Sequence, residues 1–384
     1  MPQATSAGAP TLTFRGGGWV IVLTLVLVAG LLTWALLGVM SGTHPVGDGR
    51  TLASYGFALE PLKADRAYLV SSGNPRDFLQ TLDNPSTIRG VEMLDYNQNQ
   101  RRKYVVTTDR VAGVALNGEA RAYPLHVLNA HEVINDTLGG VPIAVSYSPL
   151  TDSVVVFDRR VGGASNPPRL FKVSGLLYNS NLVMYDQAAD APAQPGAPAA
   201  GASLWSQLGL RAVAGPAAAA GAVLEPLPGV NIATWKQWLA LHPDTTVVAP
   251  DPGSAQRYKE FSYARYYLTP RVDYPVAALP QEQPEFTQVD EALAAVAAGK
   301  PTTRKTPVLR VRAGGQEALW TLYELLQHTN GQDGEWTTTL GGVPLKVNVQ
   351  RSPAAAVVQS ENGAPVLVIP QLHFAERAFA AERP

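Results

Sequence analysis

The chain has 384 residues, of which 46% are hydrophobic and 16% charged, with 30 basic and 31 acidic side chains. This length predicts two or at most three domains with a real hydrophobic core, and the low charged fraction excludes a disordered polyelectrolyte. A net charge of -1 without basic clusters argues against a nucleic-acid partner, and the lack of cysteine excludes disulfides, thiolate metal sites and cysteine nucleophiles.

The first predicted element is an uncharged stretch at residues 19–40. As a helix it would span about 33 Å, which is the thickness of a bilayer core. Arg15 precedes it without any acidic residue, which favours a cytoplasmic tail at 1–18. The sequence therefore predicts a single-pass protein of the cytoplasmic membrane with an extracytoplasmic C-terminal body. A cleaved signal peptide is the alternative, but the stretch is long for one and Val39-Met40-Ser41 fits a cleavage site poorly.

Beyond a linker at 41–57, strands predominate. The two runs 111–116 and 120–123, joined by Asn117-Gly118, are typical of a β-hairpin, and Pro124 suits the first turn of a following helix. Further strands are predicted at 141–147, 153–157, 170–178 and 182–185. Helices are predicted at 232–241, at 287–298 with Thr287 as the N-cap, and at 318–328. The fold class is α+β, rich in β.

One tract departs from this pattern. Residues 187–202 consist almost wholly of Ala, Pro, Gly, Asp and Gln. Such a composition cannot bury enough apolar area to become ordered by itself. We expect a flexible loop between neighbouring elements.

An internal repeat is visible. Residues 114–125 align with 311–322, and each copy then reaches the same six residues, Thr-Leu-Gly-Gly-Val-Pro, at 137–142 and 339–344. The identity indicates a duplicated hairpin-helix-strand module, and independent hairpins with similar turns are the alternative.

The repeat sets the predicted domains of the body. We expect a first repeat domain at 58–275 and a second, degenerate one at 276–384. Within them, residues 306–358 should fold as the counterpart of residues 111–157, with the two Gly-Gly turns in equivalent places.

Polar side chains are concentrated in the first copy, which indicates that a site lies there. Within sixteen residues it carries Arg121, Tyr123, His126, His131, Glu132, Asn135 and Asp136. Ordinary structure is the alternative: Asn135-Asp136 is also typical turn chemistry, and Arg121 could pair with Glu132 on the surface.

At these residues the chain resembles a known family. The resemblance to the prokaryotic family called domain of unknown function 3179 is carried, in order, by GEARAYPL at 118–125, HEVIND at 131–136, PIAVSYSPL at 142–150, SGLLYNSNLVMYD at 174–186 and SLWSQ at 203–207. It covers roughly residues 104–248 and implies an exported or membrane-anchored protein without an assigned activity. Ser148 stands where family members commonly have Cys, which disfavours chemistry that needs a thiolate.

Two sets of candidate site residues follow. The catalytic candidates are His131, Glu132, Asp136 and Ser148, which the predicted hairpin places near His131. The ligand-binding candidates are Arg121, Tyr123, His131, Asn135 and Asp186. No metal site is predicted, because His126 and His131 are five residues apart and would not share a helix face, and no cofactor is predicted.

Three classes of function remain open. The favoured one is a ligand- or partner-binding accessory module of a membrane or envelope complex, attached to the membrane through residues 19–40. The second is an exported hydrolase- or transferase-like enzyme that uses His131 with Glu132 or Asp136. The third is a purely structural envelope protein.

Overall fold

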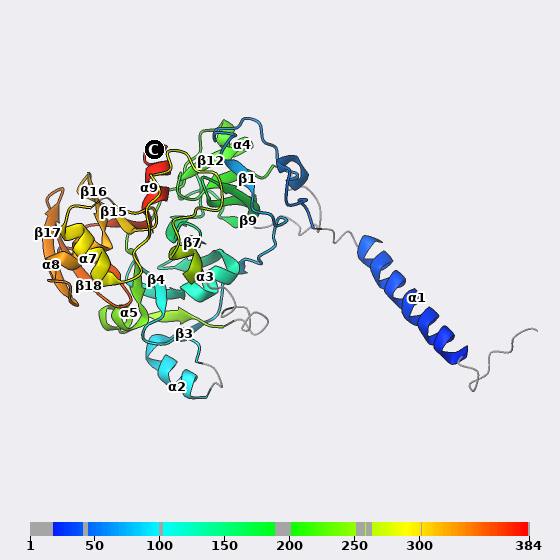
Figure 1. Cartoon of the computed structure of the whole chain (residues 1–384), viewed down its shortest axis with the longest axis horizontal. Helices are drawn as coiled ribbons and strands as arrows, with labels where there is room; N and C mark the ends of the chain where they lie inside the picture. Colours follow the sequence, from blue (N-terminus) through cyan, green and yellow to red (C-terminus); the bar gives the residue numbers. More distant parts are fainter. Residues whose placement is uncertain are drawn as a thin grey trace, which may run out of the picture. The chain divides into compact units, whose positions relative to one another are not determined.

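The computed structural model describes residues 18–40, 45–99, 103–188, 201–250, 258, 263–300 and 302–382. The chain divides into two units (Figure 1). One comprises residues 1–45 and 192–197, and the other, which we call the body, comprises residues 46–191 and 198–384.

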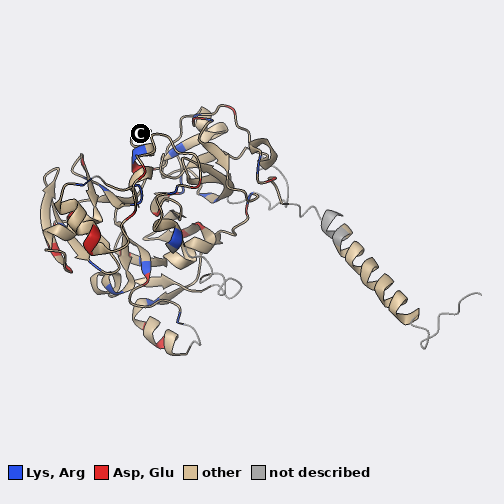
Figure 2. Cartoon of the chain, in the orientation of Figure 1, with Lys and Arg blue, Asp and Glu red and all other residues tan. Residues whose placement is uncertain are grey.

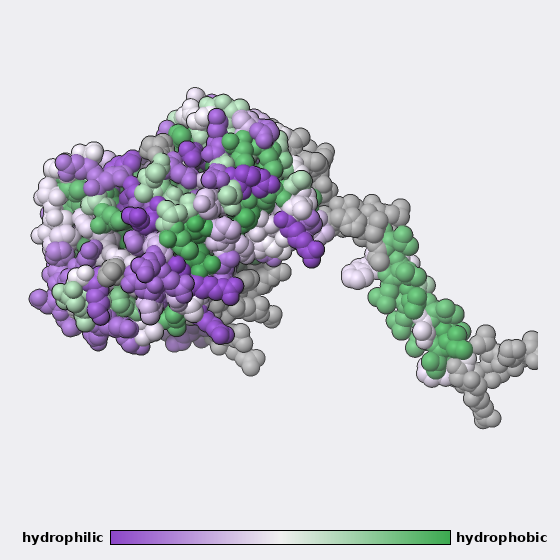
Figure 3. Space-filling model, turned by 45° about the horizontal axis from the view of Figure 1, so that its top comes forward, coloured by the Kyte–Doolittle hydropathy of each residue, from purple (hydrophilic) through white to green (hydrophobic). Residues whose placement is uncertain are grey.

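The N-terminal unit contains one helix, α1 (Gly18–Met40). Figure 2 shows no charged residue along its described part, and Figure 3 shows apolar side chains over most of its length. Within the described residues, however, no helix is both long and apolar enough to cross a membrane. The side chains of residues 35 and 37–40 lie outside the described part of the chain, so the transmembrane helix expected at 19–40 stays a prediction.

The first copy of the repeat forms two sheets of the body. A hairpin of β4 (Arg110–Leu116) and β5 (Glu119–Pro124) leads into α3 (Leu125–His131), which is followed by an antiparallel meander of β6 (Val133–Leu138), β7 (Val141–Ser148) and β8 (Ser153–Asp158). Later in the chain, β13 (Val230–Thr234) returns to pair with β4 and continues into α5 (Trp235–Leu241). β14 (Thr246–Val248) pairs with β5 in parallel, and the edge strands next to β14 and β6 are β3 (Thr87–Arg89) and β2 (Leu82–Asp83).

The second copy repeats this order. The hairpin β15 (Pro307–Ala313) and β16 (Gln316–Thr321) leads into α8 (Leu322–His328) and then into the meander β17 (Gly334–Leu340), β18 (Val343–Gln350) and β19 (Ala355–Ser360). Its return strand β20 (Leu367–Leu372) pairs with β15 and continues into α9 (His373–Phe379). The predicted counterpart relation is confirmed, and it extends to the return strand and the final helix.

The two Gly-Gly turns occupy equivalent places. Gly139 and Gly341 both have positive φ, 54° and 57°, at the tip of the first meander hairpin. Each tip touches the tip of the preceding hairpin: Asn117 Nδ2 donates to Gly139 O at 2.9 Å, and a Cβ on Gly314 would lie 1.9 Å from Gly341 O. The close approach explains why glycine is needed at these turns.

Each return strand packs against the meander of the other copy. Asn231 of β13 exchanges hydrogen bonds with Val358 of β19, whose N–H donates to the Asn231 Oδ1 at 2.9 Å. In the opposite direction, Leu372 N donates to Thr151 O, next to β8, at 2.8 Å. Both predicted repeat domains thus lie in one unit, and a boundary at residue 275 stays a prediction.

Four strands inserted between β8 and β13 form a five-stranded sheet together with β1, which precedes the first copy. Its order is β1-β9-β10-β11-β12, and its strands are β1 (Leu69–Ser71), β9 (Arg169–Tyr178), β10 (Asn181–Ala188), β11 (Leu204–Ser206) and β12 (Arg211–Ala214). The two predicted strands around residues 179–181 are therefore confirmed. Of the loop expected at 187–202, residues 187 and 188 instead belong to β10, because they pair with β9, and residues 189–200 lie outside the described part of the chain. The remaining short helices are η2 (Leu52–Tyr55), η3 (Gly90–Glu92), α2 (Met93–Gln98), α4 (Pro216–Ala219), α6 (Ala264–Tyr267) and α7 (Val289–Ala297).

Three helix predictions need correction. Residues 232–234 and 318–321 are strand, because they pair with β4 and β15, so the helices begin only at Trp235 and Leu322. The helix predicted at 287–298 begins at Val289, and Thr287 does not cap it, because its N–H and hydroxyl both donate to the carboxylate of Glu291. Sheet pairing thus overrode local helical spacing at two of the three helix starts.

Candidate functional site

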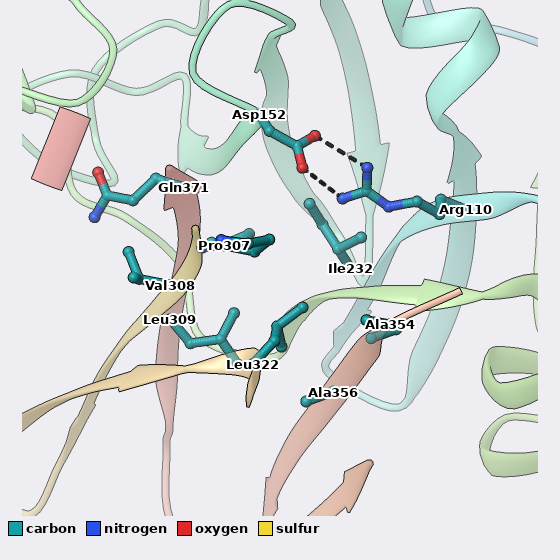
Figure 4. A pocket seen from close by; sticks show the side chains of 12 residues that line it. Arg110, Asp152, Ile232, Pro307, Val308, Leu309, Leu322, Ala354, Ala356 and Gln371 are labelled. Carbon is teal, nitrogen blue, oxygen red and sulfur yellow. Dashed lines mark hydrogen bonds and ion pairs between the residues drawn. The ribbon is translucent and has the colours of Figure 1, made fainter. Parts of the chain in front are cut away.

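The turn between β7 and β8, Tyr147 to Ser153, is held by contacts from many parts of the body, and we call it the signature loop. Its Asp152 accepts two hydrogen bonds from the Arg110 guanidinium, at 3.2 and 2.8 Å, and one from Tyr147 Oη at 2.8 Å. Figure 4 shows this ion pair at a pocket that is otherwise lined mainly by apolar residues of both repeat copies, such as Ile232 and Leu309. Since its two charged residues neutralise one another, the pocket offers no unpaired charge to a ligand.

Behind the signature loop lies a fully buried polar network. Asn181 Nδ2 donates to Thr151 Oγ1 at 2.9 Å and to Gln207 Oε1 at 2.7 Å. Gln207 in turn accepts from Ser153 Oγ at 2.8 Å and donates to Ser146 Oγ at 3.2 Å. The network joins the motifs at 142–150, 174–186 and 203–207. Its side chains satisfy one another's hydrogen-bonding groups inside the core, which makes the signature loop rigid.

Tyrosines also contact the signature loop. We call Tyr263, Tyr266, Tyr267 and Tyr274 the tyrosine cover. Two of its hydroxyls bind the loop backbone: Tyr266 Oη donates to Leu150 O at 3.0 Å, and Tyr267 Oη to Pro149 O at 2.7 Å. The rings of Tyr266 and Tyr267 are 5.7 Å apart between centroids, and those of Tyr263 and Tyr267 are 6.4 Å apart.

Glu132 directly follows α3 and is the C-cap of this helix. Its backbone has φ 55° and ψ −31°, a combination that a non-glycine residue rarely adopts and that costs about 1–3 kcal/mol. Its carbonyl accepts from Tyr147 N at 2.8 Å, which ties it to the start of the signature loop. Within the described residues its half-buried carboxyl has no hydrogen-bond or ion-pair partner.

The electrostatics of Glu132 follow from this setting. Because burial removes water and no cation compensates, the pKa of Glu132 is raised to about 8. Burial, with a contribution from the negative charge of Glu132, also raises the pKa of Tyr263 to about 12. The pKa of Tyr274 is raised by burial and by the nearby Asp273 and Glu132. Glu132 therefore lies within electrostatic reach of two members of the tyrosine cover.

Lys305 contacts Tyr266 of the tyrosine cover. The Lys305 ammonium lies 3.3 Å from the centroid of the Tyr266 ring and donates to the Tyr266 carbonyl. Burial lowers the pKa of Lys305 to about 8, against the opposing charge of Glu285. A cation–π contact is therefore already present in this cluster.

Ser148 is the last residue of β7 and His131 is the last residue of α3, and their expected proximity stays a prediction. The pairing of Val133 with Ser146, together with the bond from Tyr147 N to Glu132 O, ties the residues that follow α3 to the end of β7. His131 is buried, with Nδ1 2.5 Å from Gln80 O and Nε2 3.3 Å from Tyr258 Oη. Because both ring nitrogens have hydrogen-bond partners, the His131 ring is held in one orientation.

Arg121, Tyr123 and Asp136 form a separate buried group. The Arg121 guanidinium lies 2.6 Å from Asp136 Oδ2, and Tyr123 Oη donates to the same oxygen at 2.8 Å. The other oxygen accepts from Thr137 N at 2.7 Å. Arg121 thus pairs with Asp136 in a partly buried ion pair, and the alternative of a surface pair between Arg121 and Glu132 is wrong.

Asn135 and Asp186 join strands. Asn135 binds Phe171 of β9 through both its Nδ2 and its Oδ1, at 2.9 and 3.0 Å. Asp186 accepts from Ser203 N at 2.7 Å and forms an ion pair with Arg169. The candidates thus fall into several hydrogen-bonded groups, and Glu132 and Ser148 are the two that the structure connects to the signature loop.

Sequence reasoning missed the tyrosine cover and Lys305. They lie more than a hundred residues after Glu132, outside the range of the resembling motifs, and no local spacing marks them. Within the described residues, no group of three His, Asp or Glu side chains is placed to hold a metal ion.

A family model described as a protein of unknown function, DUF3179, matches residues 84–372. The chain belongs to this family. The match includes both repeat copies, so it is wider than the stretch whose motifs show the resemblance. No curated protein and no solved structure matches the chain.

Proposed function

We propose that this protein is a ligand-binding module and that Glu132, with the tyrosine cover above the signature loop, forms its binding site. The observation that carries the proposal is the unpartnered, half-buried carboxyl of Glu132 on a strained backbone. Strain and uncompensated burial both cost stability, and folds retain such costs chiefly at functional sites. The surrounding polar network and Asp152 ion pair supply the rigid support that a binding site needs.

An acid–base enzyme is the second candidate. A carboxyl whose pKa is raised to about 8 is protonated at neutral pH and can donate a proton to a bound substrate. Ser148 ends β7 and His131 ends α3, but both nitrogens of His131 are engaged, which favours binding over catalysis by a serine and histidine pair.

We also propose the extracytoplasmic location expected from the uncharged residues 19–40 and the preceding Arg15. The support is the sequence alone. Protease added to intact spheroplasts should digest the body and leave an N-terminal fragment. A protected body would contradict this location.

The binding proposal is tested by native mass spectrometry of the full chain, purified in mild detergent. Wild type should carry a small molecule that Glu132→Gln loses. Glu119→Gln is the matched control, since Glu119 is an exposed carboxylate on β5, and it should retain the molecule. Equal retention by all three proteins, or retention by none, would contradict the proposal.

A further inference from the structure

Two of the carboxylates near the proposed site are paired with arginines. Asp152 is paired with Arg110 at 2.8 Å, and Asp273 with Arg271 at 2.9 Å. Lys305 faces the Tyr266 ring. Glu132 remains without a counterion within the described residues. A ligand that restored electrical balance here would carry positive charge.

The tyrosines near Glu132 have the matching chemistry. Tyrosine rings attract cations through the negative potential of their faces, and recognition of organic ammonium groups uses aromatic side chains beside an acidic group. Tyr263 and Tyr274 are half-buried and lie within electrostatic reach of Glu132. The ammonium of Lys305 over Tyr266 shows that this cluster already accommodates one such contact.

Other ligand classes fit less well. An anion would be repelled by the ionised carboxyl of Glu132, and Arg110 and Arg271 are already paired with carboxylates. A divalent metal ion prefers several oxygen or nitrogen ligands, and the described residues offer no such group.

We propose that the site binds a small organic cation, whose ammonium group pairs with the Glu132 carboxylate and contacts the rings of Tyr263 and Tyr274. The proposal rests on the proposed binding function and names its ligand class. Binding requires the ionised carboxylate, so a protonated Glu132 must release its proton to the solvent as the cation enters.

The titratable groups around Glu132 define the pH dependence. They are His131 before it in the chain, Tyr147 opposite it on β7, and Tyr263 and Tyr274 in the cover. Burial raises the pKa of Tyr147 well above its usual range, as it does those of the cover tyrosines, so these hydroxyls stay neutral while Glu132 ionises. Affinity should therefore rise with pH through the pKa of Glu132 and then level off.

Choline is the probe, and 3,3-dimethylbutan-1-ol, which has the same shape without the charge, is the matched neutral ligand. Calorimetric titration of the full chain in mild detergent should show choline affinity rising about tenfold from pH 6 to pH 7 and levelling off above pH 8. Glu132→Gln should weaken choline binding at pH 9 at least tenfold and remove the pH dependence, whereas Glu119→Gln should leave both unchanged. The alcohol should bind more weakly, without dependence on pH.

A second pair of variants tests the rings independently of the charge. Tyr263→Phe keeps an aromatic face and should bind choline within twofold of wild type, whereas Tyr263→Leu should bind about threefold more weakly. Choline binding no stronger than that of the alcohol, or unaffected by Glu132→Gln, would overturn the cation assignment. If mass spectrometry still shows a ligand that depends on Glu132, only the ligand class fails; if no such ligand exists, the proposed function fails as well.

Discussion

Glu132→Gln replaces an ionisable carboxyl with a neutral amide of nearly the same shape. The pKa of Glu132 is raised from 4.5 to about 8 by burial, so between these values the folded chain holds a proton that the unfolded chain has released. The free energy of unfolding of the wild type therefore falls as pH rises through this interval. The amide cannot ionise, so the free energy of unfolding of the variant does not fall in this way.

The interval sets the size of the effect. At about 1.4 kcal/mol per pH unit, the free energy of unfolding of the wild type can fall by at most about 5 kcal/mol across this interval. Because water partly reaches the carboxyl, we expect a loss of about 2–3 kcal/mol. The difference between Glu132→Gln and wild type should be smallest at pH 5 and reach its full size above pH 8, with the variant more stable.

Urea unfolding followed by tryptophan fluorescence at pH 5, 7 and 9 measures this difference. Glu119→Gln, at an exposed position, should follow the wild type at each pH. A difference between Glu132→Gln and wild type that stays constant across these pH values would refute the claim that Glu132 is a protonated, uncompensated carboxyl at neutral pH.

Three further substitutions test the fold around the site, each through the free energy of unfolding in urea. Asp136→Asn should cost about 3 kcal/mol, because it leaves a buried arginine without its charged partner, and a loss below about 1 kcal/mol would show that the pair is unimportant. His131→Gln should cost about 1–3 kcal/mol through its buried hydrogen bonds, whereas His328→Gln, exposed in the second copy, should cost less than about 0.5 kcal/mol; equal losses would contradict the burial argument. Gly113→Ala should cost about 1–3 kcal/mol, because the new Cβ would lie 2.2 Å from the buried ring of Trp238, and a neutral result would mean that the ring can move.

The repeat was predictable because its signals are local. Asn117-Gly118 and the two Thr-Leu-Gly-Gly-Val-Pro segments fix tight turns wherever they occur, and strand alternation on either side fixes the hairpins. The start of α8 was mispredicted for the opposite reason: residues 318–321 have helical spacing locally, but pairing with β15 decides their conformation.

The candidate site was only partly predictable. Polar density in the first copy indicated Glu132 as one candidate, but it could not separate Glu132 from Asp136, whose partner Arg121 lies fifteen residues earlier on β5. The tyrosine cover reaches the signature loop through contacts between segments more than a hundred residues apart. Such contacts depend on the whole fold and leave no spacing in the sequence.

The central claim is that Glu132 is a protonated carboxyl that a ligand can reach. A carbodiimide reacts with protonated, accessible carboxyls, and peptide mapping by mass spectrometry locates the adduct. At pH 7 the adduct should form at Glu132, decline as the pH rises above 8, and be suppressed by the bound ligand. An unmodified Glu132 at pH 7, or modification that does not change between pH 6 and pH 9, would contradict the claim.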